Sequence, residues 1–203
     1  ALNSSAFIFN NAIVNSFGIV AATALAVGFI VLDIADSVLW GLTQAVAIMV
    51  GQSLGAGMPQ RARSVAVTAS HALFLFISAG STLVYAFRRS FISFFVDDPR
   101  VFGEADTLIS MAAVTLPFFG LFFIGLSAGR GSGHTLVPSI IGIVRLWIVR
   151  IGLGYYISVV LGFGTFGYWL AIALSNFVGG VLAYIWVRKG NWTRPIIKQK
   201  SST

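Results

Sequence analysis

The chain has 203 residues, of which 57% are hydrophobic and only 9% are charged. A soluble domain carries about 25% charged residues, so this composition excludes a chain that covers itself with solvated side chains. The formal charge of +7 does not indicate nucleic-acid binding, because the basic residues lie at the ends of apolar runs and not in a patch interleaved with aromatic side chains.

Glycines, prolines and charged residues divide the chain into six apolar segments. A bilayer core about 30 Å thick needs about 20 helical residues, so the segments predict an all-α integral membrane protein, a bundle of six transmembrane helices. The opening ALNSSAFIFN has no basic n-region and no initiating methionine, and it reads as the middle of a helix, so we expect the first helix to be truncated. The segments are approximately residues 1–17, 19–52, 62–87, 99–128, 136–161 and 165–187.

The first two segments carry polar side chains at helical spacing. Asn11 and Asn15 are four residues apart on the first segment, where they either line a central cavity or hydrogen-bond between helices. Asp33 and Asp36 are the only acidic residues well inside an apolar segment, and they share a face that Gln44 continues. Carboxylates near the middle of a membrane are costly, so the pair is either an ion-coupling site or part of a structural ion pair.

The stretch VGQSLGAGMPQRAR, residues 50–63, predicts a tight hairpin between the second and third segments. Its glycines permit a sharp turn, and we expect Arg61 and Arg63 to reach the lipid headgroups. Further along, Asp98 followed by Pro99 is typical of a helix start, and Pro117 should kink the fourth segment.

The last two segments contain two arginines and a run of small residues. We expect Arg145 and Arg150 to snorkel or to pair with carboxylates of the same bundle, rather than to contact a substrate. In the sixth segment small side chains recur every four residues, a pattern typical of close helix packing. These residues are Ala171, Ser175, Gly179 and Ala183.

Arginine and lysine are unevenly distributed between the two sides of the predicted bundle. Most lie on the side of the hairpin and of the C-terminal residues, whereas Arg88, Arg89 and Arg100 lie on the other side among acidic residues. By the positive-inside rule the first side is cytoplasmic. We therefore expect a multi-pass protein of the cell membrane, with residues 1–190 as the membrane lobe and residues 191–203 as a cytoplasmic tail.

The sequence carries no constellation for catalysis, a metal or a cofactor. Cysteine is absent, which excludes thiol chemistry and cysteine-ligated metals, and His71 and His134 have no metal-ligand companions. The stretch GRGSGH follows a membrane helix instead of a strand and lacks the lysine of a phosphate loop. We expect neither an enzyme nor a metal or cofactor site.

Three stretches together resemble the multidrug and toxin extrusion (MATE) family of transporters. VGQSLGAGMPQRAR is similar to the loop between the second and third helices of that family's C-terminal lobe. GLSAGRGSGHTLVPSIIGIVRLWIVRIGLGYYI is similar to the passage from the fourth to the fifth helix, and FGYWLAIALSNFVGGVLAYIWVRKGNW is similar to the last helix. The resemblance covers essentially the whole chain in the right order.

The resemblance implies one half of a twelve-helix transporter, in which two six-helix lobes rock against each other to alternate access. The partner would be an N-terminal six-helix lobe, in the same polypeptide or in a second chain. The implied activity is antiport, with export of amphipathic, often cationic, organic compounds against an inward flow of protons or sodium ions.

The resemblance also bears on the coupling ion. In the sodium-coupled branch, the C-terminal lobe carries carboxylates on its first and fourth helices, and this chain has Asn3 and Phe119 there. That ion site is therefore expected to be absent, with the principal aspartate on the missing lobe.

Two other functions stay open from the sequence. A lipid-linked sugar flippase shares the lobe architecture, and it would be favoured if Arg145 and Arg150 faced the cavity. A membrane assembly subunit that transports nothing would need only the six spans.

Overall fold

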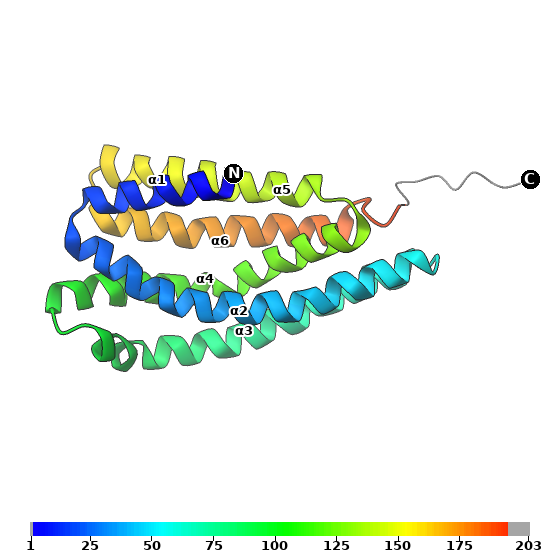
Figure 1. Cartoon of the computed structure of the whole chain (residues 1–203), viewed down its shortest axis with the longest axis horizontal. Coiled ribbons are helices and arrows are strands. Elements are labelled where there is room, and N and C mark those ends of the chain that lie inside the picture. The colour runs from blue at the N-terminus through cyan, green and yellow to red at the C-terminus, as the bar shows by residue number, and fades with distance from the viewer. Residues whose placement is uncertain (1, 195–203) are drawn as a thin grey trace, which may run out of the picture.

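The computed structural model describes residues 2–194, with the side chains of residues 5–30, 33, 34 and 36–194. The side chain of Asn3 and residues 195–203 of the expected tail lie outside this part of the chain. The described regular structure is entirely helical, and the helices lie side by side in one bundle (Figure 1). They are α1 (Leu2–Ser16), α2 (Ile19–Gly55), α3 (Pro59–Phe95), α4 (Pro99–Ser132), α5 (Leu136–Ile143), the π-helices η1 (Val144–Leu153) and η2 (Tyr156–Val160), and α6 (Gly164–Lys189).

The predicted organisation into six helical segments is confirmed, with α5, η1 and η2 together forming the fifth. Within the described residues, five helical stretches are long and apolar enough to cross a membrane, whereas α1 has 15 residues. The third helix extends to Phe95 instead of ending near residue 87. It does so because Arg88 and Arg89 continue the helix and pair with Asp106 of α4.

Helix α4 lies at the centre of the bundle and packs against α2, α3 and α6. Phe122 and Ile124 belong to a buried core that also contains Leu39 of α2 and Ala183 of α6. Pro117 lies inside the helix, where it cannot donate a backbone hydrogen bond, and the ribbon of α4 bends along its course (Figure 1). Three faces of α4 are therefore covered by other helices of the same lobe.

The two ends of the bundle differ in their connections (Figure 1). The α2–α3 turn, the α4–α5 turn and the end of α6 lie at one end, here called the tail end. The α1–α2 turn, the α3–α4 loop and the turn before α6 lie at the other, here called the acidic end. At 37 residues each, α2 and α3 are about 55 Å long, and the hairpin that joins them projects beyond the other helices at the tail end (Figure 1).

The hairpin at the tail end is built as the glycines predict, and its second arginine has a further role. Gly57 adopts a left-handed φ of 72°, and Pro59 begins α3. Arg63 donates hydrogen bonds to the carbonyl oxygens of Arg188 (2.7 Å) and Gly190 (2.5 Å). The guanidinium of Arg63 therefore caps the open carbonyls at the end of α6, a contact that the sequence did not predict.

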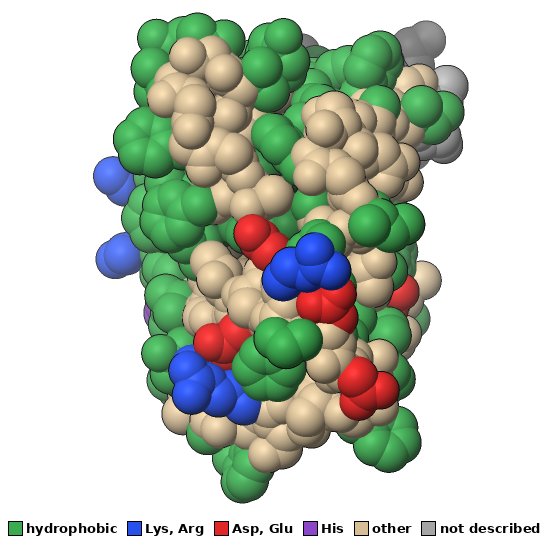
Figure 2. Space-filling model, turned by 90° about the vertical axis from the view of Figure 1, so that its left-hand side faces the viewer, with side chains coloured by type: hydrophobic (Ala, Val, Ile, Leu, Met, Phe, Trp, Pro, Cys, Tyr) green, Lys and Arg blue, Asp and Glu red, His purple; other side chains and the backbone are tan. Residues whose placement is uncertain are grey.

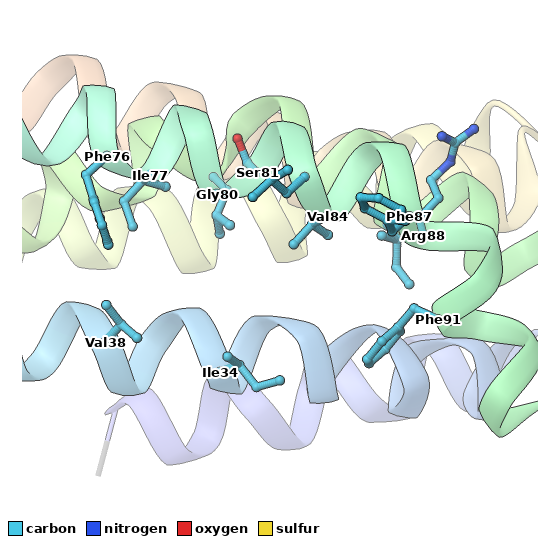
Figure 3. A pocket seen from close by; sticks show the side chains of 13 residues that line it. Ile34, Val38, Phe76, Ile77, Gly80, Ser81, Val84, Phe87, Arg88 and Phe91 are labelled. Carbon is cyan, nitrogen blue, oxygen red and sulfur yellow. The ribbon is translucent and has the colours of Figure 1, made fainter.

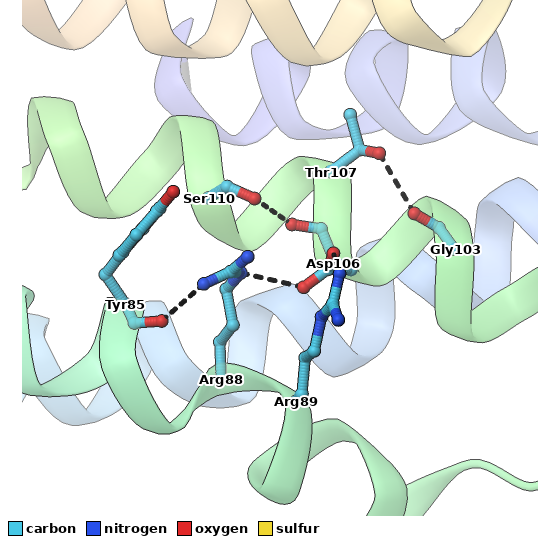
Figure 4. Close-up of polar contacts among 7 residues, drawn as sticks. All are labelled: Tyr85, Arg88, Arg89, Gly103, Asp106, Thr107 and Ser110. Atoms are coloured by element: carbon cyan, nitrogen blue, oxygen red, sulfur yellow. Dashed lines mark hydrogen bonds and ion pairs between the residues drawn. The ribbon is translucent and has the colours of Figure 1, made fainter.

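At the acidic end, charged side chains of both signs lie next to one another (Figure 2). Asp98 begins α4 as predicted, and its Oδ1 accepts a hydrogen bond of 2.8 Å from the backbone N–H of Arg100. The Nε atom of Arg88 lies 2.7 Å from Oδ1 of Asp106, and Nη2 of Arg89 lies 3.6 Å from Oδ2 (Figure 4). These contacts join α3 to α4.

One glycine on each helix allows α6 to lie directly on α4. A Cβ atom at Gly180 would collide with the backbone carbonyl group of Phe118, and a Cβ atom at Gly125 would come within 2.8 Å of Ala183 Cβ. Backbone atoms cannot turn aside as a flexible side chain can. This part of the α4–α6 contact therefore requires glycine.

We expect Gly180→Ala to destabilise the purified protein in detergent, because the added methyl group overpacks a rigid contact, at a cost of about 1–3 kcal/mol. Gly103→Ala is the matched control, since a Cβ atom there meets nothing within 4 Å. Thermal unfolding should give a lower Tm for the first variant and an unchanged or higher Tm for the second. Equal Tm values would contradict the close α4–α6 contact.

We expect Asp98→Ala to lower the Tm at neutral pH, because it removes the cap of α4. Hydrogen bonds from the Arg100 side chain and backbone hold the pKa of the Asp98 carboxyl below its ordinary value of 3.8. A lowered pKa means that the carboxylate stabilises the fold above 3.8 and that this stabilisation is lost as the pH falls through the folded-state pKa. The Tm difference from the parent should therefore vanish in strong acid. Asp97→Ala is the control, and the same loss of Tm in both variants would rule out a specific cap.

Candidate functional site

A polar stripe runs along the middle of α2. It consists of Asp33, Asp36, Trp40 and Gln44, whose spacings of three and four residues place them on one face of the helix. Asp33 and Gln44 are exposed, Asp36 is half-buried and Trp40 is 44% exposed. An adjacent face of α2 packs into the core through buried residues that include Leu39. The stripe therefore lies along the edge of the packed face, with Asp33 and Gln44 exposed at its two ends.

Trp40 holds Asp36 and is itself held by α4. The indole N–H donates a hydrogen bond of 3.2 Å to Oδ2 of Asp36. The indole ring meets Phe123 edge-on at 5.5 Å, and the guanidinium of Arg130 lies 4.8 Å from the ring centre. A carboxylate beside an exposed aromatic face is an arrangement that suits an organic cation.

The asparagines of α1 lie on the side of that helix nearer α2. Asn11 and Asn15 follow Phe7 at four-residue spacing, and the ring of Phe7 lies 6.0 Å from that of Phe29 in α2. Both asparagines are exposed. Among the described residues, no hydrogen bond joins them to Asp33 or Asp36. The buried amide of α1 is instead that of its neighbour Asn10, whose Oδ1 accepts a hydrogen bond of 2.9 Å from the hydroxyl of Tyr168.

The two arginines of the fifth segment converge on one amide of α6. Nη1 of Arg145 lies 3.1 Å and Nη2 of Arg150 lies 3.3 Å from the same oxygen, Oδ1 of Asn176. Nε of Arg150 also donates to the hydroxyl of Ser175 at 3.1 Å. The expected carboxylate partner is thus replaced by an amide and a hydroxyl, and within the described residues no carboxylate forms an ion pair with either arginine.

The π-helical backbone explains how both arginines reach one acceptor. In an α-helix, residues five apart differ in direction by about 140°, because each residue turns the chain by about 100°. The π-helix η1 hydrogen-bonds at five-residue spacing and aligns such residues. Arg145 and Arg150 therefore share a face. The sequence does not predict this helix type, because a short apolar run carries no signal that separates a π-helix from an α-helix.

Arg145 is buried between α6 and two aromatic rings of α4. Its guanidinium lies 4.8 Å from the ring centre of Phe119 and 4.5 Å from that of Phe122. Gly179 leaves room for the side chain, since a Cβ atom there would collide with the arginine stem. The face of Phe119 is thus covered by a fixed positive charge.

The small residues of α6 are all buried, and they face two different neighbours. The methyl group of Ala171 packs on Gly154, where an added Cβ atom would lie only 3.2 Å from it. Gly179 packs on the side chain of Arg145. Ser175 bonds Arg150, whereas Ala183 faces Gly125 of α4. Small size at these positions therefore serves arginine packing as well as helix packing.

The two histidines have local partners. Nε2 of His71 lies 2.8 Å from the hydroxyl of Tyr184, and Nδ1 of His134 lies 3.1 Å from the carbonyl oxygen of Ser132. Among the described residues, no three side chains of the metal-binding types gather in one place.

The candidate site is thus the polar stripe of α2. Asn11 and Asn15 lie one and two turns from Phe7 toward the α1–α2 turn, whereas Asp33 lies one turn from Phe29 in the opposite direction, so the asparagines are not next to the stripe.

Comparison with known proteins gives one consistent family. The MatE family model matches residues 1–156. A probable multidrug resistance protein NorM from Rhodopseudomonas palustris is 31% identical over 171 residues, and Protein DETOXIFICATION 31 from Arabidopsis thaliana is 26% identical over 178 residues. A crystal structure of a mutant of the MATE transporter VcmN from Vibrio cholerae has the same fold over 94% of this chain, with a TM-score of 0.85 and 18% identity.

The matched proteins are much longer than this chain. The matches cover 79% and 86% of this chain but only 35% of the NorM protein and 34% of the DETOXIFICATION protein. For VcmN the share is 44%. The chain therefore spans less than half the length of the relatives that it matches.

We expect Asn176→Ala to destabilise the purified protein by about 1.5–3 kcal/mol, the typical contribution of hydrogen bonds to a charged group. Asn176→Asp keeps the shape and supplies a carboxylate to both arginines, so it should retain the parent Tm or raise it. Thermal unfolding of the two variants in one detergent is the measurement. Equal Tm values for the alanine and aspartate variants would show that the two arginines do not depend on the Asn176 amide.

Proposed function

This chain belongs to the MatE family of multidrug and toxin extrusion transporters, and from that membership we propose that it acts as one lobe of a secondary antiporter. The second lobe is an N-terminal six-helix bundle, in the same polypeptide or in a second chain. The exported compounds are amphipathic organic cations, and protons or sodium ions flow inward. Two lobes moving against each other would open the cavity to each side in turn.

The observation that carries this proposal is the polar stripe of α2. Asp36 and the exposed ring of Trp40 offer a negative charge and an aromatic face at one place. Such a pair binds an organic cation more strongly when water is excluded, as it would be between two lobes. We propose that Asn11 and Asn15, which are exposed on α1 nearer the α1–α2 turn, line the same cavity closer to the acidic end.

Buried Arg145 bears on which lobe binds the coupling ion. A guanidinium fixed 4.8 Å from Phe119 repels a second cation at that position. We therefore propose that this lobe holds no sodium ion there. Asp33 and Asp36 instead tune coupling by binding a proton or cation, secondary to a main site on the other lobe.

The two alternatives are less well supported. A sugar flippase would be favoured by cavity-facing arginines, but Arg145 is buried inside the lobe and Arg150 is bonded to α6. An assembly subunit that transports nothing has no use for two carboxylates in the middle of a membrane helix.

We propose an orientation for the lobe from its charges. Arg61, Arg130, Arg188 and Lys189 lie at the tail end, whereas the arginines of the acidic end are accompanied by carboxylates. Under the positive-inside rule, the tail end is cytoplasmic in the cell membrane.

We expect Asp36→Asn and Asp33→Asn, made in the full-length transporter, to reduce ethidium efflux by about tenfold, or 1.4 kcal/mol, for the more important carboxylate. The pH or sodium dependence of efflux should change as well. Efflux from cells is compared at matched membrane abundance, and Asp97→Asn at the acidic end is the control. Unchanged efflux and unchanged ion dependence in both variants would refute the coupling role. Loss of folded protein, rescued by neutralising an arginine, would show a structural ion pair instead.

A further inference from the structure

Two cavities of the lobe differ in what they offer to a ligand. The groove between α2 and α3 has a volume of about 420 Å³, and its described lining is mainly apolar, as at Val38 (Figure 3). The hydroxyl of Ser81 bonds a backbone carbonyl oxygen, and the guanidinium of Arg88 pairs with Asp106. A much smaller cavity between α1 and η1 is instead bounded by hydrogen-bond donors.

This second cavity, of about 10 Å³, is here called the α1–η1 cavity. Helix α1 and η1 lie side by side, and both contribute to its wall (Figure 1). A space of this size holds one water molecule or one small ion. Its lining residues are Ala6, Phe7, Asn10, Leu146, Arg150 and Ile151.

The first donor of the α1–η1 cavity is the side-chain amide of Asn10, which is 4% exposed. Its Oδ1 accepts the hydrogen bond from Tyr168, and this bond orients the amide. Its Nδ2 is buried and has no hydrogen-bond partner among the residues that the structure describes. An N–H group buried without an acceptor is costly, so this amide requires an acceptor from outside the chain.

The second donor is the guanidinium of Arg150, which brings a positive charge to the opposite wall. Arg150 and Arg145 share the oxygen of Asn176, and the buried Nε of Arg145 has no hydrogen-bond partner in the described part of the chain. Asp36 acts on Arg145 only from beyond ion-pair distance. Two buried positive charges that share neutral acceptors are costly unless an anion lies close to them.

The chemistry of this lining favours an anion over a water molecule. Asn10 and Arg150 present N–H groups to the cavity, whereas the other four lining side chains are apolar. A water molecule there would accept hydrogen bonds but find no side-chain acceptor for its own hydrogens. An anion needs only donors, and it also offsets the charge of the guanidinium groups. The small volume restricts the anion to a single atom, and the flexible stem of Arg150 can adjust to an ion slightly larger than water.

We propose that the α1–η1 cavity binds one chloride ion, held by Nδ2 of Asn10 and by the guanidinium of Arg150. The ion is a fixed component of the lobe. It offsets the positive charge of η1 and ties α1 to η1, and it is neither transported nor used as the coupling ion.

The first test is the Tm of the full-length transporter, purified in detergent and exchanged into sodium chloride or sodium gluconate at equal ionic strength. A ligand that binds the folded state raises the Tm, so we expect a value about 2–4 °C higher in chloride. Asn10→Asp and Asn176→Asp each supply a carboxylate to Arg150, and each should abolish the difference between the two salts. Asn191→Asp adds the same charge at the exposed tail end and should preserve the difference.

The second test locates the ion in crystals of the full-length parent grown in sodium bromide, because bromide scatters anomalously. We expect an anomalous peak between Asn10 and Arg150. Absence of this peak, or equal Tm values for the parent in the two salts, would overturn the proposal. A chloride-dependent Tm that survives in both aspartate variants would also overturn it, because the ion would then bind elsewhere. If Asn10→Asp does not fold, Asn176→Asp and the bromide peak of the parent decide the question. Neither readout involves efflux, so the result is independent of the proposed transport site.

Discussion

The lobe depends on polar contacts that converge on α6. Lipid offers no hydrogen bonds, so polar groups inside a membrane must be satisfied by other parts of the protein. Four helical elements form polar contacts with α6. Asn10 of α1 contacts Tyr168, and Glu104 of α4 contacts Trp169. Arg63 of α3 bonds the carbonyl oxygen of Arg188, and the arginines of η1 bond Asn176. His71 of α3 also meets α6, through the hydroxyl of Tyr184, whereas the contacts of Arg88 and Arg89 with Asp106 join α3 to α4.

Helix α2 stands outside this network. Its carboxylate at Asp36 bonds only to Trp40 one turn further along, and its packing on α4 is through apolar side chains such as Leu39. The proposed transport function would need this division, because groups that hold the lobe together cannot exchange their partners during each cycle.

Part of this architecture could be predicted from the sequence. Apolar run lengths predicted the helical segments, the dipeptide of Asp98 and Pro99 predicted the start of α4, and the glycines near residue 57 predicted the hairpin. These signals are local, so they need no knowledge of neighbouring helices. The roles of Arg63 and Arg145 were beyond such reasoning, because their partners lie 125 and 31 residues away. The placement of Asp33 and Asp36 on one face followed from spacing alone, whereas the bond from Trp40 to Asp36 needed side-chain geometry.

The position of α6 as the common partner has a consequence for biosynthesis. Chains are made at about 5–20 residues per second, so Asn176 is added roughly two to six seconds after Arg145, which lies 31 residues earlier. During that interval both guanidinium groups of η1 have entered or approached the membrane without their acceptor. The polar groups of the earlier helices likewise precede their partners on α6: α1 bonds Tyr168, α4 bonds Trp169, and α3 bonds the end of α6. The nascent lobe must therefore be held by the insertion machinery, or remain partly hydrated, until its sixth helix arrives and closes the network in one step.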